Sequence, residues 1–221
     1  MSGGMDQGEF DRALVASAFA LAGEQGWTRL SVAAAARRAG LPLDRARARF
    51  PGRGAVLARF GRMADQAALA EVPGEGPVRD RLFHLLMRRI DVLEAHRAGV
   101  LALLRMLPAD PPLSLWLACA SRRSMRWMLE AAGVEARGLR GELRVKGLLG
   151  VWLWTLRAWQ ADANPDLAHT MAALDTALAR AERMAGWIGS GAVDAAAATD
   201  IPPPAEAPPP DASSGPVAPD D

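Results

Sequence analysis

Glycine and proline breaks divide the first 188 residues into nine segments, and each segment repeats apolar residues at helical spacing. Strand-type alternation is absent, tyrosine does not occur, and alanine and leucine dominate. We therefore expect an all-α fold of about nine helices. The expected helices span residues 9–22, 31–38, 43–50, 53–70, 78–95, 97–107, 113–132, 138–161 and 165–188.

Several classes of function are excluded by residues that the chain lacks. Cys119 is the single cysteine, so neither a disulfide scaffold nor a cysteine-based zinc site is possible. The three histidines lie far apart, at positions without metal-ligand spacing, and no HExxH, GxSxG or glycine-rich phosphate loop occurs. We expect no metal, no cofactor and no catalytic residues, and hence no enzyme.

Charge is distributed unevenly along the chain, although the net charge is only +1. Residues 192–221 carry six acids and no base, which leaves 26 bases against 19 acids in the rest. Nine arginines and one acid, Asp44, lie between residues 27 and 63. Segment 189–221 holds eight of the sixteen prolines and few bulky apolar residues. It is expected to be a disordered tail, with a docking peptide or an acidic screen as the alternatives.

A helix-turn-helix pattern occupies the first part of the chain. Two short helices, 31–38 and 43–50, flank the four-residue turn AGLP. In a DNA-binding protein the second of these helices enters the major groove, while flanking arginines contact phosphates. The arginines expected at DNA are Arg37, Arg38, Arg45, Arg47, Arg49 and Arg53.

The run from residue 13 to residue 57 resembles the TetR family of transcriptional regulators. Its most specific part is Phe50-Pro51, followed by Arg53 and by Val56-Leu57. The resemblance implies a TetR-like fold with a helix-turn-helix head on a larger helical bundle. It also implies a homodimer and binding to DNA. We divide the chain into a head with its connecting helix (9–70), a ligand-binding or dimerisation bundle (78–188) and the tail (189–221).

The segment GLLGVWLWTLRAW, residues 147–159, is apolar on nearly every face. A helix of this kind is buried on all sides, or it divides its faces between a core and a partner. We expect Trp154 and Leu156 at a dimer interface, and Met125, Trp127 and Met128 on an adaptable partner surface. An apolar slot in the same bundle is expected to be lined by Leu148, Leu149, Trp152, Trp159, Met171 and Leu174.

Residues 78–184 resemble the TetR-fold accessory proteins of ubiquinone biosynthesis. The matching pieces are the MLP break at residues 106–108, Trp127 ahead of AAG, and Trp159 with Asp162 at the end of the long apolar helix. This family binds isoprenoid lipid and presents it to the demethoxyubiquinone hydroxylase. The resemblance therefore implies a ubiquinone-type lipid and that hydroxylase as partners, with peripheral contact at the inner membrane.

Two functions follow from these observations. The longer resemblance favours a lipid-binding accessory protein of ubiquinone biosynthesis, and the alternative is a ligand-responsive, DNA-binding TetR-type regulator. The N-terminus lacks the basic start and apolar stretch of a signal peptide, and the longest mostly apolar run, 145–156, is too short to span a bilayer. We expect a cytoplasmic protein.

Overall fold

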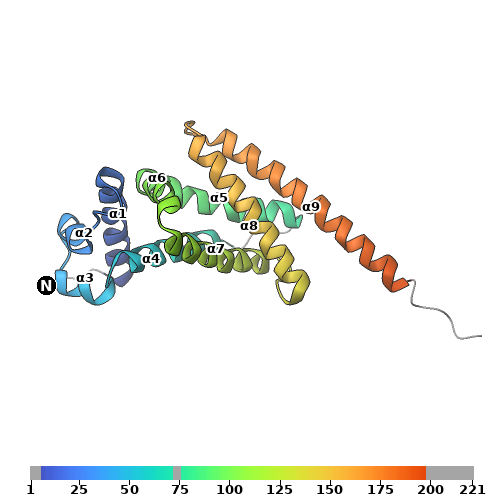
Figure 1. Cartoon of the computed structure of the whole chain (residues 1–221), viewed down its shortest axis with the longest axis horizontal. Helices are drawn as coiled ribbons and strands as arrows, with labels where there is room; N and C mark the ends of the chain where they lie inside the picture. Colours follow the sequence, from blue (N-terminus) through green and yellow to red (C-terminus); the bar gives the residue numbers. More distant parts are fainter. Residues whose placement is uncertain (1–5, 72–75, 198–221) are drawn as a thin grey trace, which may run out of the picture. The chain divides into compact units, whose positions relative to one another are not determined.

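The computed structural model describes residues 6–71 and 76–197, and all the regular structure in them is helical (Figure 1). The helices are α1 (Gln7–Gln25), α2 (Val32–Arg38), α3 (Leu43–Arg49), α4 (Arg53–Leu69), α5 (Val78–Glu94), α6 (Arg97–Met106), the 3₁₀ turn η1 (Leu107–Ala109), α7 (Pro111–Ala131), α8 (Gly138–Ala161) and α9 (Ala168–Ala197). The all-α expectation is confirmed for the described residues.

The expected helix boundaries agree with the structure to within three residues, except at α9. This helix begins at Ala168 rather than at residue 165, because Leu167 adopts a left-handed φ of 54° just before it. It also continues to Ala197, past the expected end at residue 188 and across the glycines at 189 and 191, to an alanine-rich end. The remainder of the expected tail, residues 198–221, lies outside the described residues.

Short polar side chains start several of these helices. Asp6 and Glu9 form a capping box at α1, Ser31 accepts from the Ala34 amide at α2, and Asp110 caps α7. By contrast, α3 begins after Pro42 with no side-chain cap, and Ala46 is its only buried residue. Because a seven-residue helix is unstable in isolation, α3 depends on tertiary contacts for its position.

Helices α1, α2 and α3 form the head, and α4 connects it to the body, which begins at α5 (Figure 1). Head and body meet where α1 packs against α6. A Cβ at Gly99 would lie 2.4 Å from the carbonyl oxygen of Phe19, so only glycine fits there. Beside this contact, the buried Trp27 donates from Nε1 to the Gly99 carbonyl at 2.8 Å. The head is therefore held against the body by backbone packing and a buried hydrogen bond.

We predict that Gly99→Ala lowers the free energy of unfolding by about 2–3 kcal/mol, since α1 and α6 must separate to admit the methyl group. Gly61→Ala is the matched control, because a Cβ at Gly61 in α4 meets nothing within 4 Å. This control should gain up to about 1 kcal/mol from helix propensity. Urea denaturation measures both changes, and equal effects of the two substitutions would contradict the close α1–α6 packing.

Candidate functional site

The inward face of α3 carries two arginines that contact the start of α1. The Arg45 guanidinium lies 4.3 Å from the centroid of the Phe10 ring. Arg49 donates from Nε and an Nη to the two carboxylate oxygens of Asp11, at 2.7 and 2.8 Å. These two arginines of the expected DNA-binding set therefore have partners within the head.

The outward face of α3 presents four exposed side chains of different chemistry: Leu43, Asp44, Arg47 and Ala48. Arg47 donates to the Pro51 carbonyl at 2.8 Å, which holds it along the outer side of the helix. The mixture of a cation, an acid and small or apolar groups is suited to contacts with base edges.

Arg37, Arg38 and Arg53 flank this face at the end of α2 and the start of α4, and all three are exposed. Arg38 pairs with Glu24 at 2.7 Å, and Arg53 lies 3.8 Å from Asp110. Arg37 has no ion-pair partner in the described part of the chain. Together with Arg47, we call these residues the outward arginines. Three consecutive elements therefore offer cations around the exposed side of α3.

Five of the six residues expected to line a lipid slot belong to the packed core or lie against it, and Met171 is the exception. Leu148, Trp152, Trp159 and Leu174 are buried, while Leu149 and Met171 are half-buried. Trp159 donates from Nε1 to Glu94 at 2.8 Å, and the Arg97 guanidinium lies 4.7 Å from the centroid of its ring. Trp159 therefore joins α8 to α5 and α6. Neither of the grooves described below is lined by any of the six residues.

A charge cluster of the buried Arg89 and the half-buried Asp65 lies beside Trp152. The Arg89 guanidinium of α5 is 4.9 Å from the centroid of the Trp152 ring and forms an ion pair with Asp65 of α4. Ser124 of α7 donates to the same carboxylate at 2.8 Å. Burial lowers the pKa of Arg89 to about 10, so the side chain keeps its charge at neutral pH. The cluster links α4, α5, α7 and α8. It places charged and polar side chains in a region that we expected to be wholly apolar.

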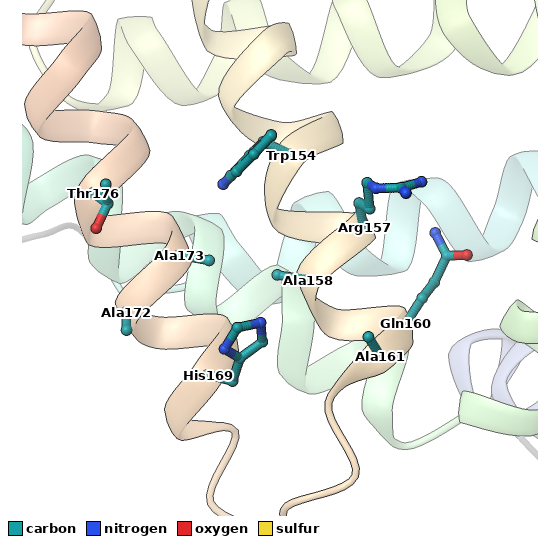
Figure 2. A pocket seen from close by; sticks show the side chains of 9 residues that line it. All are labelled: Trp154, Arg157, Ala158, Gln160, Ala161, His169, Ala172, Ala173 and Thr176. Carbon is teal, nitrogen blue, oxygen red and sulfur yellow. The ribbon is translucent and has the colours of Figure 1, made fainter.

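The outer face of α8 and α9 contains an open groove (Figure 2). Trp154 points from α8 toward α9, and Ala158 and Ala173 face one another across the groove (Figure 2). His169 of α9 lies toward the end where the two helices are connected (Figure 2). The remaining lining residues are Arg157, Gln160, Ala161, Ala172 and Thr176. The floor is thus apolar and small, with polar side chains around it.

The two residues expected at a dimer interface lie on different sides of α8. Trp154 lines the groove and is 53% exposed, whereas Leu156 does not line it and is half-buried against the core. Gly147 and Gly150 are also exposed on α8, and a Cβ at either would meet nothing within 4 Å. Each glycine costs a helix roughly 1 kcal/mol relative to alanine, and no neighbour within the described chain requires it. The two glycines therefore leave helix backbone exposed on this face of α8.

The expected partner surface on α7 requires correction. Met125 and Met128 are fully buried in the core, because they lie on the side of α7 that faces the rest of the body. Only Trp127 of this set is exposed, at 57%. The methionines fill the interior and are not available to a partner.

A second, shallow groove is lined by α4 and α5 side chains that include His84, Arg88 and Asp91, together with the α6 cap residue His96. Burial lowers the pKa of His96, whose ring packs against Phe19 and Phe60. No group of three or more potential metal ligands occurs among the described residues. Within the same residues, no helix has the length and hydropathy needed to cross a bilayer.

Comparisons with known proteins show which solved structures share this fold. No protein-family model and no curated protein matches the chain. A TetR transcriptional regulator from Nitrosomonas europaea ATCC 19718 superposes with a TM-score of 0.64 at 24% identity, over 80% of this chain and 98% of that one. A TetR-family transcriptional regulator from Streptomyces coelicolor gives 0.56 at 22% identity, over 90% and 92%. The TetR-like fold is therefore confirmed, whereas the resemblance to ubiquinone accessory proteins is not.

We predict that Asp65→Leu lowers the free energy of unfolding by about 3–5 kcal/mol, because it leaves the buried Arg89 without its anion. Arg89→Leu should cost less, since Asp65 is half-buried and keeps the hydrogen bond from Ser124. The double variant should cost much less than the sum of the two. A double-mutant cycle by urea denaturation measures the interaction free energy between Arg89 and Asp65. If the effects of the two single substitutions simply add, the ion pair does not stabilise the fold.

Proposed function

We propose that this protein is a DNA-binding transcriptional regulator that acts as a homodimer. The observation that carries the proposal is the division of the α3 arginines. Arg45 and Arg49 are engaged with α1, which leaves Arg47 on an exposed face together with Asp44 and Ala48. Arginine pairs with guanine, aspartate accepts from cytosine, and alanine contacts the thymine methyl group. The proposed reading face thus combines three kinds of base contact.

Three of the outward arginines supply the backbone contacts in this proposal. Arg37, Arg38 and Arg53 lie on the elements before and after α3, where phosphate contacts would fix its register on the duplex. The solved structures that share the fold are described as transcriptional regulators, and the matches extend over head and body. Both facts support DNA rather than a lipid as the principal ligand.

The α8–α9 groove supports the homodimer. A two-fold axis would set Trp154 of one subunit against the small-residue floor of the other, and the exposed Gly147 and Gly150 would allow the helices to approach closely. Two heads would then read two half-sites related by the same axis.

The lipid-accessory hypothesis stays a prediction from the sequence. It has the fold in common with the regulator, but two of the side chains that it requires around a lipid already have charged partners: Trp152 contacts Arg89, and Trp159 contacts Glu94 and Arg97. No observation on the described residues favours the hydroxylase partner or a membrane contact over the regulator.

For DNA binding, we predict that Arg47→Ala lowers affinity for the protein's own promoter DNA by about 1–3 kcal/mol and relaxes sequence preference at one base pair. Arg37→Ala should weaken binding to all sequences alike and reduce the slope of log K against log salt by about one. Fluorescence anisotropy titrations at several salt concentrations measure both effects. Arg140→Ala, which removes an exposed arginine of the body, is the control and should change neither quantity.

The first test of this proposal is whether the wild-type protein binds DNA. It should retard a fragment of its own promoter at low salt and prefer that fragment to unrelated DNA of equal length. Failure to bind any promoter fragment under these conditions would reject the regulator and return the lipid hypothesis to first place.

For the dimer, we predict that Trp154→Arg yields a monomer at micromolar concentration, because an unpaired charge buried in the interface costs several kcal/mol. Trp127→Arg is the matched control, since Trp127 is similarly exposed but lies on α7. Sedimentation velocity distinguishes the two variants. A dimer that survives Trp154→Arg and is lost in Trp127→Arg would place the interface on α7 instead.

A further inference from the structure

Asp11 of α1 is an acid with no exposed surface in a head that is otherwise rich in arginine. Arg49 of α3 binds both of its carboxylate oxygens, and Nε of Arg59 in α4 lies 2.8 Å from Oδ2. One carboxylate is thus shared between cations from two other helices. Burial raises the pKa of Asp11, but hydrogen bonds and charges from Arg49 and Arg59 outweigh this effect and hold the pKa below its usual value.

This carboxylate is well placed to control the orientation of α3. The helix has seven residues, one buried side chain and no N-cap, so apolar packing and local structure hold it weakly. Its two inward arginines are four residues apart, and both rest on adjacent residues of α1, Phe10 and Asp11. A bidentate arginine–carboxylate contact fixes direction as well as distance.

Resting on the proposed function, we infer that Asp11 is a positioning residue for sequence recognition, which sets the angle of α3 through Arg49 and ties that angle to α4 through Arg59. Asp11 touches no DNA in this proposal. Its second effect is electrostatic, because it offsets part of the charge of two arginines whose side chains remain 38% and 18% exposed.

These two roles have opposite effects on DNA binding, and this makes the inference testable. Asp11→Asn leaves a side chain of the same shape. It removes one negative charge, which raises the net charge of the head by one, and it weakens the contact through which Arg49 holds α3 against α1. Non-specific affinity should stay level or rise, and its salt dependence should steepen. Affinity for the specific promoter site should fall, so that the ratio of specific to non-specific affinity drops at least tenfold.

Glu24→Gln is the matched control. It also removes one negative charge from the head and releases an arginine, Arg38, but it does not contact α3. Specific and non-specific affinities should rise together in this variant and keep the wild-type ratio. Anisotropy titrations of full-length protein against the promoter site and against a scrambled duplex of equal length give both affinities.

Arg49→Lys provides a second variant for the case that Asp11→Asn does not fold, as judged by circular dichroism at the assay temperature. It keeps the charge but loses the two-pronged contact, so the affinity ratio should fall with little change in the salt slope. The inference is overturned if a folded Asp11→Asn changes both affinities by the same factor, or if Arg49→Lys keeps the wild-type ratio. Failure of the proposed function is a different result, in which the wild-type protein itself shows no preference for the promoter site.

Discussion

Helix α1 is the constraint on which the arrangement of the head depends. In its later half, the Phe19 backbone touches α6 at Gly99 so closely that no side chain fits between them. At its start, Phe10 and Asp11 receive the two inward arginines of α3. Because α1 is a continuous helix, the position of the exposed face of α3 is fixed relative to the body by contacts at both ends of α1.

Two ion-pair clusters, each built on one buried charged side chain, Asp11 or Arg89, constrain how the helices around them can pack. Small and aliphatic side chains pack in many ways, but a buried carboxylate must meet its cation or be left at a high energetic cost. Asp11 of α1 pairs with arginines of α3 and α4. Asp65 of α4 pairs with Arg89 of α5 and accepts a hydrogen bond from Ser124 of α7. Both clusters include α4, so the connecting helix is held by charge at both the head and the body.

The sequence was sufficient to predict the helices and the turn between α2 and α3, and it allowed residues 147–159 to divide their faces between the core and the surface, as they do. These properties follow from local periodicity and from breaking residues such as Pro42 and Gly133. Side-chain direction within one helix was less predictable. The pair Met125 and Met128 flanks Trp127, but only the tryptophan is exposed, because a rotation of about 100° per residue separates neighbours.

The charged residues of the interior were missed altogether, since their partners are distant in the sequence. Arg49 and Asp11 are 38 residues apart, and no periodicity connects them. A signal for Asp11 did exist, because it directly follows Phe10 and precedes Leu14 and Ala18 on the buried side of α1. An acid in an apolar stripe indicates a buried cation, although the stripe alone does not identify which of 25 arginines provides it.

Because some arginines have partners inside the head, the number of arginines in the head overstates the positive charge that is available to DNA. Of the nine arginines between residues 27 and 63, Arg45, Arg49 and Arg59 contact α1 and stabilise the fold. Lysine could not replace them equally, because a guanidinium lies flat on an aromatic ring and forms a two-pronged contact with a carboxylate. The preference for arginine over lysine in this chain therefore has a structural consequence, whatever its origin. Six of the nine arginines are left for DNA, and of these Arg47 lies on α3, which the inward arginines join to α1.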